Sequence, residues 1–168
     1  KSMFLIADPG NQIPYFENFA SFPPANWEIR NPDGLTKWEH SQDIFDPSSM
    51  NNQNPFLSKS ASYNNFSAAV KGAEDYIISA NINLFNESKP VLYFYVAYAD
   101  PASGSDTLRI DISSDCGDSF TPTSYKKGGS DLATTIGTSN FFKPQSLGDW
   151  RLDSLDLSAY IGGNIKIR

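Results

Sequence analysis

The chain has 168 residues, of which 39% are hydrophobic and 14% aromatic, so its composition supports one well-packed domain and argues against wholesale disorder. Its formal net charge of −6 argues against nucleic acid and anionic membrane as partners, because both require a basic surface. The single cysteine excludes an internal disulfide. Divalent cations, neutral glycans and basic protein surfaces remain compatible with this charge.

Residues 1–14 are predicted to be a linker or an N-terminal extension, and residues 15–168 a single domain. The only apolar run at the start, Met3 to Ala7, is far too short for a signal-peptide core or a membrane span. We therefore expect no membrane insertion and interpret the chain as a piece of a longer polypeptide.

Further along, residues 41–65 are polar, rich in Asn and without periodicity, so they predict a long surface loop, followed by a short strand at 68–70. Strand signals then become frequent. A Gly-Gly turn and small residues predict a second loop excursion from the strands at 126–140. The predicted strands lie within 75–84 (DYIISANINL), 90–100 (PVLYFYVAYAD), 106–115 (DTLRIDISSD) and 164–168 (NIKIR).

Apolar residues alternate with others in the strands at 90–100 and 106–115, and Ile165 and Ile167 repeat the pattern at the end of the chain, which is typical of strands with one buried face. Eleven Gly and eleven Pro are spread along the chain, and no long window has apolar residues at helical spacing. Several short strands separated by turns predict an all-β fold, an antiparallel β-sandwich or jelly roll. The side chains expected to face the core are Leu92, Phe94 and Val96 in one strand and Leu108, Ile110 and Ile112 in the other.

The stretch DISSDCGDSF (residues 111–120) combines three acids, a glycine and the only cysteine. We interpret it as the end of a strand followed by a hairpin turn at 114–118, with Gly117 free to adopt a positive φ. Cys116 has no histidine nearby in the sequence, so a nucleophile is not expected. A weak cation contact from Asp115 or Asp118 remains open.

Catalytic arrangements find little support. His40 is the only histidine, so every Ser-His-Asp or Cys-His arrangement would have to use it, and no Gly-x-Ser-x-Gly signature occurs. One histidine and one cysteine leave too few ligands for zinc. Glycoside hydrolysis needs two converging acids, but Asp106 and Asp111 fall on opposite faces of an ideal strand. The chain is therefore predicted not to be an enzyme.

A hard cation needs only oxygen ligands from loops and strand ends, so calcium is more plausible, although no contiguous EF-hand loop occurs. Exposed tryptophans could also stack on sugar rings, although core or loop anchoring is the alternative for each. The candidate cation ligands are Glu17, Asp33, Asp75, Asp106 and the trio Asp149, Asp153 and Asp156. The available tryptophans are Trp27, Trp38 and Trp150.

Several segments together resemble the cleaved-adhesin and choice-of-anchor J domains, relatives of the MAM fold. The resemblance covers about residues 15–168 in unbroken order. This family's domains continue past I-R-F into a last strand with an I-D-D-I motif, so we expect that strand to be lacking here. The matching segments are F-E-N-F (Phe16–Phe19), F-P-P-x-x-W (Phe22–Trp27), Asp33-Gly34, Trp38, DYIISANINL, PVLYFYVAYA, DTLRIDISSDCGDSFT and DWRLDSLDLSAYIGGNIKIR.

The resemblance implies a jelly roll of the concanavalin-like or galactose-binding-like kind, in a secreted or cell-surface protein of Bacteroidetes-type bacteria. It implies a non-catalytic adhesion or accessory domain of an adhesin or peptidase, which binds a protein or glycan on a host, a matrix or a polysaccharide. Other domains of the same polypeptide are expected as neighbours. The alternatives are a carbohydrate-binding module of a parent hydrolase and a free-standing hydrolase.

The resemblance also implies a structural calcium ion, for which Glu17 is the first candidate. The full predicted metal set is Glu17, Asp33, Asp75, Asp106 and Asp153. The predicted ligand-binding residues are Trp38 and Trp150.

Overall fold

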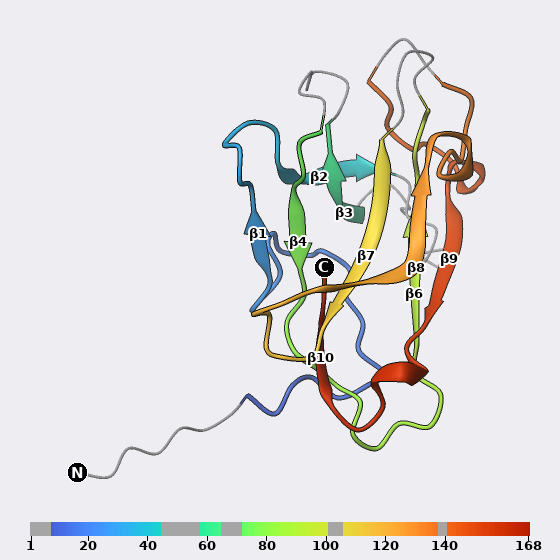
Figure 1. Cartoon of the computed structure of the whole chain (residues 1–168). Coiled ribbons are helices and arrows are strands. Elements are labelled where there is room, and N and C mark those ends of the chain that lie inside the picture. Colours follow the sequence, from blue (N-terminus) through green and yellow to red (C-terminus); the bar gives the residue numbers. More distant parts are fainter. Residues whose placement is uncertain (1–7, 45–57, 65–71, 101–105, 138–140) are drawn as a thin grey trace.

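Regular structure in this chain consists almost entirely of β-strands. The computed structural model describes residues 8–44, 58–64, 72–100, 106–137 and 141–168. Within these ranges there is no α-helix, and all pairs of named strands are antiparallel (Figure 1). The strands are β1 (Glu28–Arg30), β2 (Trp38–Ile44), β3 (Ser58–Tyr63), β4 (Tyr76–Ile78), β5 (Ile82–Asn83), β6 (Val91–Val96), β7 (Thr107–Ser113), β8 (Thr121–Gly128), β9 (Arg151–Asp156) and β10 (Asn164–Ile167). Short 3₁₀ helices are η2 (Gly129–Asp131), η3 (Leu147–Asp149) and η4 (Ser158–Tyr160).

The largest sheet has the strand order β5-β10-β7-β8. In it, β10 is central, with Ile165 opposite Ile82 of β5 and Ile167 opposite Ile112 of β7. Just after β4, the backbone N–H of Ser79 donates to the carbonyl of Ile167 at 2.8 Å. Therefore β4 and β5 run along the same side of β10 as one interrupted strand, and β1 pairs with β4 on its far side.

The described part of the N-terminal extension, residues 8–14, lies against this sheet. The backbone N–H of Asn11 donates to the carbonyl of Asn81 at 2.8 Å, and the N–H of Asn83 donates back to Asn11 at the same distance. Ile13 packs against the hydrophobic core. This segment thus covers the edge of β5 that β10 leaves unpaired.

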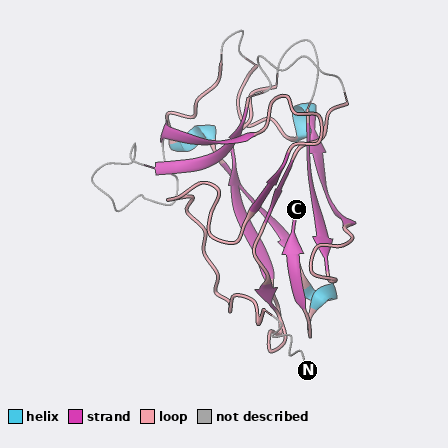
Figure 2. Cartoon of the chain, turned by 90° about the vertical axis from the view of Figure 1, so that its left-hand side faces the viewer, coloured by secondary structure: helices cyan, strands magenta, loops and turns pink. Residues whose placement is uncertain are grey.

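The β6–β9 ribbon packs against the large sheet. Its strands pair along their whole length, from Val91 opposite Asp156 to Val96 opposite Arg151. The ring of Phe94 meets that of Tyr125 on β8 edge-on, with centroids 5.1 Å apart. Figure 2 shows most strands running along the long axis of the molecule, while a pair at the upper left runs across it. The buried core cluster consists of Ile82, Leu84, Ile110, Ile112, Tyr125, Leu155, Leu157 and Ile165.

The prediction of an all-β fold with antiparallel pairing is confirmed for the described residues. Leu92 and Phe94 face the core as expected from their alternation. No sheet among the described strands is closed, and their strand order alone does not make a jelly roll evident. The hairpin after β7 has its reversal where expected, with Gly117 at φ 99°.

The prediction of a loop over 41–65 was wrong at both ends. Strand β2 begins at Trp38, and β3 ends at Tyr63, directly opposite it. The remaining pairs set Glu, His, Ser and Ile opposite Ser and Ala, so polar residues predominate and no regular apolar alternation identifies either strand. Residues 45–57 and the short strand expected at 68–70 lie outside the described residues. The loop excursion expected at 126–140 begins only after Gly128, because β8 continues to that residue.

A buried carboxylate joins β7 to the end of β10. Asp111 is only 2% exposed and forms ion pairs with Arg168 at 2.6 Å and Arg109 at 2.9 Å. The guanidinium of Arg168 lies between the rings of Tyr76 and Phe120, 4.4 and 4.5 Å from their centroids. A buried charge is tolerated only when it is paired, so Arg168 stabilises Asp111 inside the sheet.

We predict that Arg168→Ala lowers the free energy of unfolding by about 3 kcal/mol, because it leaves a buried carboxylate with one cationic partner. The matched control is Arg30→Ala, which removes the exposed pair with Glu28 and is expected to cost less than about 1 kcal/mol. Urea unfolding at neutral pH measures both. Equal losses in the two variants would contradict a stabilising role for Arg168.

Candidate functional site

One predicted cation ligand, Asp153, is buried on β9 among cationic and phenolic partners. It is 7% exposed on β9, and Arg151 of the same strand donates to it at 2.8 Å. From β8, the Tyr125 hydroxyl donates at 2.7 Å and the Lys127 ammonium at 3.0 Å. Burial raises the pKa of Asp153, but these three hydrogen-bond donors outweigh it and hold the pKa well below its usual range. Both carboxylate oxygens are thus engaged by the protein itself.

Asp149 and Asp156, the other members of the predicted trio, cap local turns. Asp149 accepts the backbone N–H groups of Gln145 and Ser146 at the start of η3. Asp156 accepts both the N–H and the hydroxyl of Ser158, at 2.8 and 2.6 Å, and these bonds lower its pKa. The structure places neither of them in a shared site with Asp153.

Three of the predicted cation ligands, Asp33, Asp75 and Asp106, act electrostatically on the hydroxyl of Tyr63, and only Asp75 contacts it. That hydroxyl donates to Asp75 at 2.7 Å. Burial raises the pKa of Tyr63 most, followed by the hydrogen bond to Asp75 and the negative charges of all three acids. The three acids come from the β1–β2 loop, the residue before β4 and the residue before β7, so the fold brings distant segments together. We call Asp33, Asp75 and Asp106 the acidic group.

Each member of the acidic group has one oxygen fixed by a donor. Asp33 accepts the backbone N–H of Leu35 at 2.9 Å, and Asp106 accepts the hydroxyl of Tyr98 at 3.1 Å. The Oδ1 atom of Asp75 is buried and has no hydrogen-bond partner among the described residues. Even so, no three His, Cys, Asp or Glu side chains in the described part of the chain are arranged to hold a metal ion by themselves.

Glu17 is not connected to the acidic group by any contact among the described residues. Its carboxylate accepts the backbone N–H of Phe19 at 2.6 Å, which fixes the first loop. From β2, His40 lies 2.9 Å from the carbonyl of Phe19 through Nε2 and stacks on Phe22. His40 therefore connects the first loop to β2.

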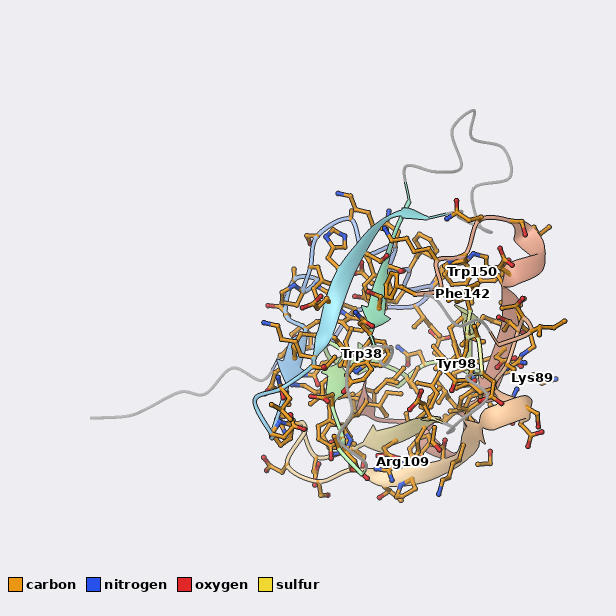
Figure 3. All side chains as sticks on the ribbon, turned by 90° about the horizontal axis from the view of Figure 1, so that it is seen from above. Trp38, Lys89, Tyr98, Arg109, Phe142 and Trp150 are labelled. Atoms are coloured by element: carbon orange, nitrogen blue, oxygen red, sulfur yellow. The ribbon has the colours of Figure 1, made fainter. Side chains whose placement is uncertain are left out.

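The predicted ligand-binding tryptophans are both half-buried. The indole N–H of Trp38 donates to the carbonyl of Asp75 at 3.2 Å, and its ring packs on Tyr63. The indole nitrogen of Trp150 is buried without a hydrogen-bond partner among the described residues. Seen from above, Trp38 and Trp150 lie within the outline of the molecule, whereas Lys89 lies at its edge (Figure 3). Trp27 is likewise an anchor, donating to the Tyr15 hydroxyl at 2.9 Å.

Exposed aromatic rings instead lie on the outer face of the β6–β9 ribbon. Tyr93 is 65% exposed, and Tyr95, two residues further along β6, is 41% exposed. Val91 on β6 and Leu152 on β9 are exposed beside them, and Leu152 is directly opposite Tyr95. We call these four residues the aromatic row. Sequence reasoning used the inward residues of this strand but not the outward ones, although the same alternation identifies both.

The β7–β8 turn is held together internally. Asp115 accepts the hydroxyls of Ser113 and Ser119 at 2.6 and 2.5 Å, and these bonds, with the N–H of Ser119, lower its pKa. Cys116 is exposed, with φ 65°. The turn therefore uses Asp115 as a local scaffold, and Asp115 belongs to no group of three or more possible metal ligands among the described residues.

Comparison with known proteins identifies no relative: no protein family, no curated protein and no solved structure matches the chain. The resemblance to cleaved-adhesin domains therefore stays a prediction. None of the described helices is long and apolar enough to cross a membrane.

We predict that Asp153→Asn lowers the free energy of unfolding at neutral pH and weakens its dependence on pH below about 4. The pKa of Asp153 is lower in the folded chain than in the unfolded one. Its stabilising contribution is therefore complete above the unfolded-state pKa and is lost as the pH falls toward the folded-state value. Urea unfolding over a pH series measures this, with the exposed neighbour change Ser154→Ala as control. An unchanged acid slope in Asp153→Asn would contradict the prediction.

Proposed function

We propose that this chain is a non-catalytic binding domain of a larger secreted or cell-surface bacterial protein, acting in adhesion or as an accessory to a peptidase. The observation that carries this proposal is the aromatic row, which exposes two tyrosine rings on one face of a regular two-stranded ribbon. Aromatic side chains are enriched at binding surfaces because they offer a large apolar area together with a polar tip. Packing of this ribbon on the large sheet also supports a jelly-roll arrangement.

The chemistry of the buried acids supports binding over catalysis. Asp111 and Asp153 are the buried carboxylates among the described residues, and each is engaged by two cationic side chains. A general acid would need a raised pKa, and a hydrolytic pair would need two carboxylates facing one cleft. The ion pairs of Asp153 lower its pKa instead.

We predict that beads carrying the whole chain adhere to surfaces coated with polysaccharide or matrix protein, and that Tyr93→Ala reduces this adhesion. The control is Phe16→Ala, which removes a ring of similar exposure outside the aromatic row. Bead retention under flow measures adhesion, and assay of the released solution detects turnover of the coat. Turnover by the chain, or equal adhesion of Tyr93→Ala and the unaltered chain, would overturn the proposal.

A structural calcium ion at the acidic group is part of the proposal. The chemistry of the donors fits a hard cation, because Asp75 offers a buried carboxylate oxygen without a protein partner among the described residues, and the negative charges of Asp33 and Asp106 act on the same Tyr63 hydroxyl that donates to Asp75. Carbonyl oxygens and water commonly complete calcium sites. A bound cation would supply the positive charge that the described residues do not place beside Asp75.

We predict that calcium raises the melting temperature of the chain and that Asp75→Asn abolishes this rise. Saturation to about 100 times the dissociation constant stabilises a folded protein by about 2.7 kcal/mol. Asp131→Asn, which removes an exposed acid in η2, should keep the full effect. Scanning calorimetry in calcium and in chelator measures the difference. Identical melting in both solutions would contradict the calcium site.

A further inference from the structure

We propose that the aromatic row binds an uncharged polysaccharide, with pyranose rings stacked on Tyr93 and Tyr95. The proposal rests on the proposed binding function and names the ligand class for it. It replaces the two predicted tryptophans, which are half-buried, with two tyrosines that present their rings to solvent.

The spacing of the two rings follows from the strand. Tyr93 and Tyr95 are two residues apart on β6, so their Cα atoms are separated by about 6.6 Å and their side chains leave the same face. Both lie within the six continuous pairs of the ribbon, which hold the backbone in a regular register. The rings therefore lie in a line along the strand, as an extended chain of sugar rings requires.

Polar groups border the rings where sugar hydroxyls would lie. Ser154 of β9 is exposed directly opposite Tyr93, and both tyrosines carry phenolic hydroxyls that donate and accept hydrogen bonds. Stacking on an apolar ring face combined with hydrogen bonds at its border is the arrangement that suits a pyranose, which has C–H groups on its faces and hydroxyls on its rim.

The negative charge of the chain and of Asp156 favours neutral glycans over anionic ones. The outward residues of β6 and β9 include one charged side chain, Asp156, opposite Val91. Its pKa is lowered by the Ser158 hydrogen bonds, so it stays negative at neutral pH, and the whole chain has a formal charge of −6. Uronic acid and sulfated polysaccharides would be repelled, whereas neutral ones would not.

The dimensions of the row favour a glycan over a protein partner. Strands of six residues are about 20 Å long, and two of them span about 10 Å, so the ribbon presents roughly 200 Å² in projection. A stable protein interface buries about 800 Å² per partner. The row is thus too small to hold a second protein chain, including a second copy of this one, on its own.

Affinity electrophoresis of the whole chain in gels containing hydroxyethylcellulose, galactomannan or xyloglucan tests the proposal, with alginate as the anionic comparison. We expect retardation by at least one neutral polymer and none by alginate. Tyr93→Ala and Tyr95→Ala are each expected to weaken binding about tenfold, because each removes one stacking ring. Tyr93→Phe keeps the ring and should retain most of the binding, and Phe16→Ala should bind like the unaltered chain.

Unchanged melting temperatures of the variants show that an exposed ring was removed without loss of the fold. Retardation by alginate alone, equal binding by Tyr93→Ala, or a dimer that dissociates in Tyr93→Ala by sedimentation would each overturn the proposal. Adhesion of beads to matrix protein through Tyr93, without retardation by any neutral polymer, would refute the glycan ligand and leave the proposed binding function intact. If the beads do not adhere and no neutral polymer retards the chain, both the glycan ligand and the proposed binding function are refuted.

Discussion

The two-residue repeat of β6 determines both how this domain packs and what it presents to solvent. Leu92 and Phe94 lie against the core, and the edge-on contact of Phe94 with Tyr125 connects the ribbon to the large sheet. Because successive side chains of a strand point to opposite faces, burying these residues places Tyr93 and Tyr95 outward. The core contact and the proposed binding surface are therefore alternate positions of the same six residues.

Ion pairs between strands are the second constraint on the fold. Lys127 on β8 and Arg151 on β9 both engage Asp153, so strands from the two packed groups are tied by an ion cluster as well as by apolar contact. Asp111 does the same between β7 and the residue after β10. Buried ion pairs contribute little net stability compared with apolar packing, but each becomes costly when one partner is lost. They specify which strands are neighbours, and they use acids that would otherwise be candidates for catalysis.

Sequence reasoning succeeded where one face of a strand is buried and failed where neither is. Strands β6, β7 and β10 carry apolar residues at alternate positions, so they were predicted correctly. Strands β2 and β3 were not, because their residues are mostly polar and carry no regular apolar alternation. The break between β4 and β5 depends on the Ser79 hydroxyl, which accepts the backbone N–H of Ile167 from another strand, and no local pattern contains that partner.

The candidate sites, too, were predicted from the sequence only in part. Asp33, Asp75 and Asp106 were selected one by one as oxygen ligands, but only the fold shows that their charges act together on Tyr63 while Glu17 and Asp153 have other partners. Burial raises the pKa of Tyr98 to about 12, so this phenol stays protonated at neutral pH and donates to Asp106. The pKa of Tyr63 is also raised, so this phenol likewise stays protonated at neutral pH and donates to Asp75. Each phenol donates to one carboxylate oxygen, and the other oxygen of Asp75 stays buried without a hydrogen-bond partner among the described residues. The acidic group is thus oriented by groups that do not titrate near neutrality, and the aromatic row contains no ionisable group other than phenols. The proposed cation binding and the proposed ring stacking therefore use different residues and different chemistry.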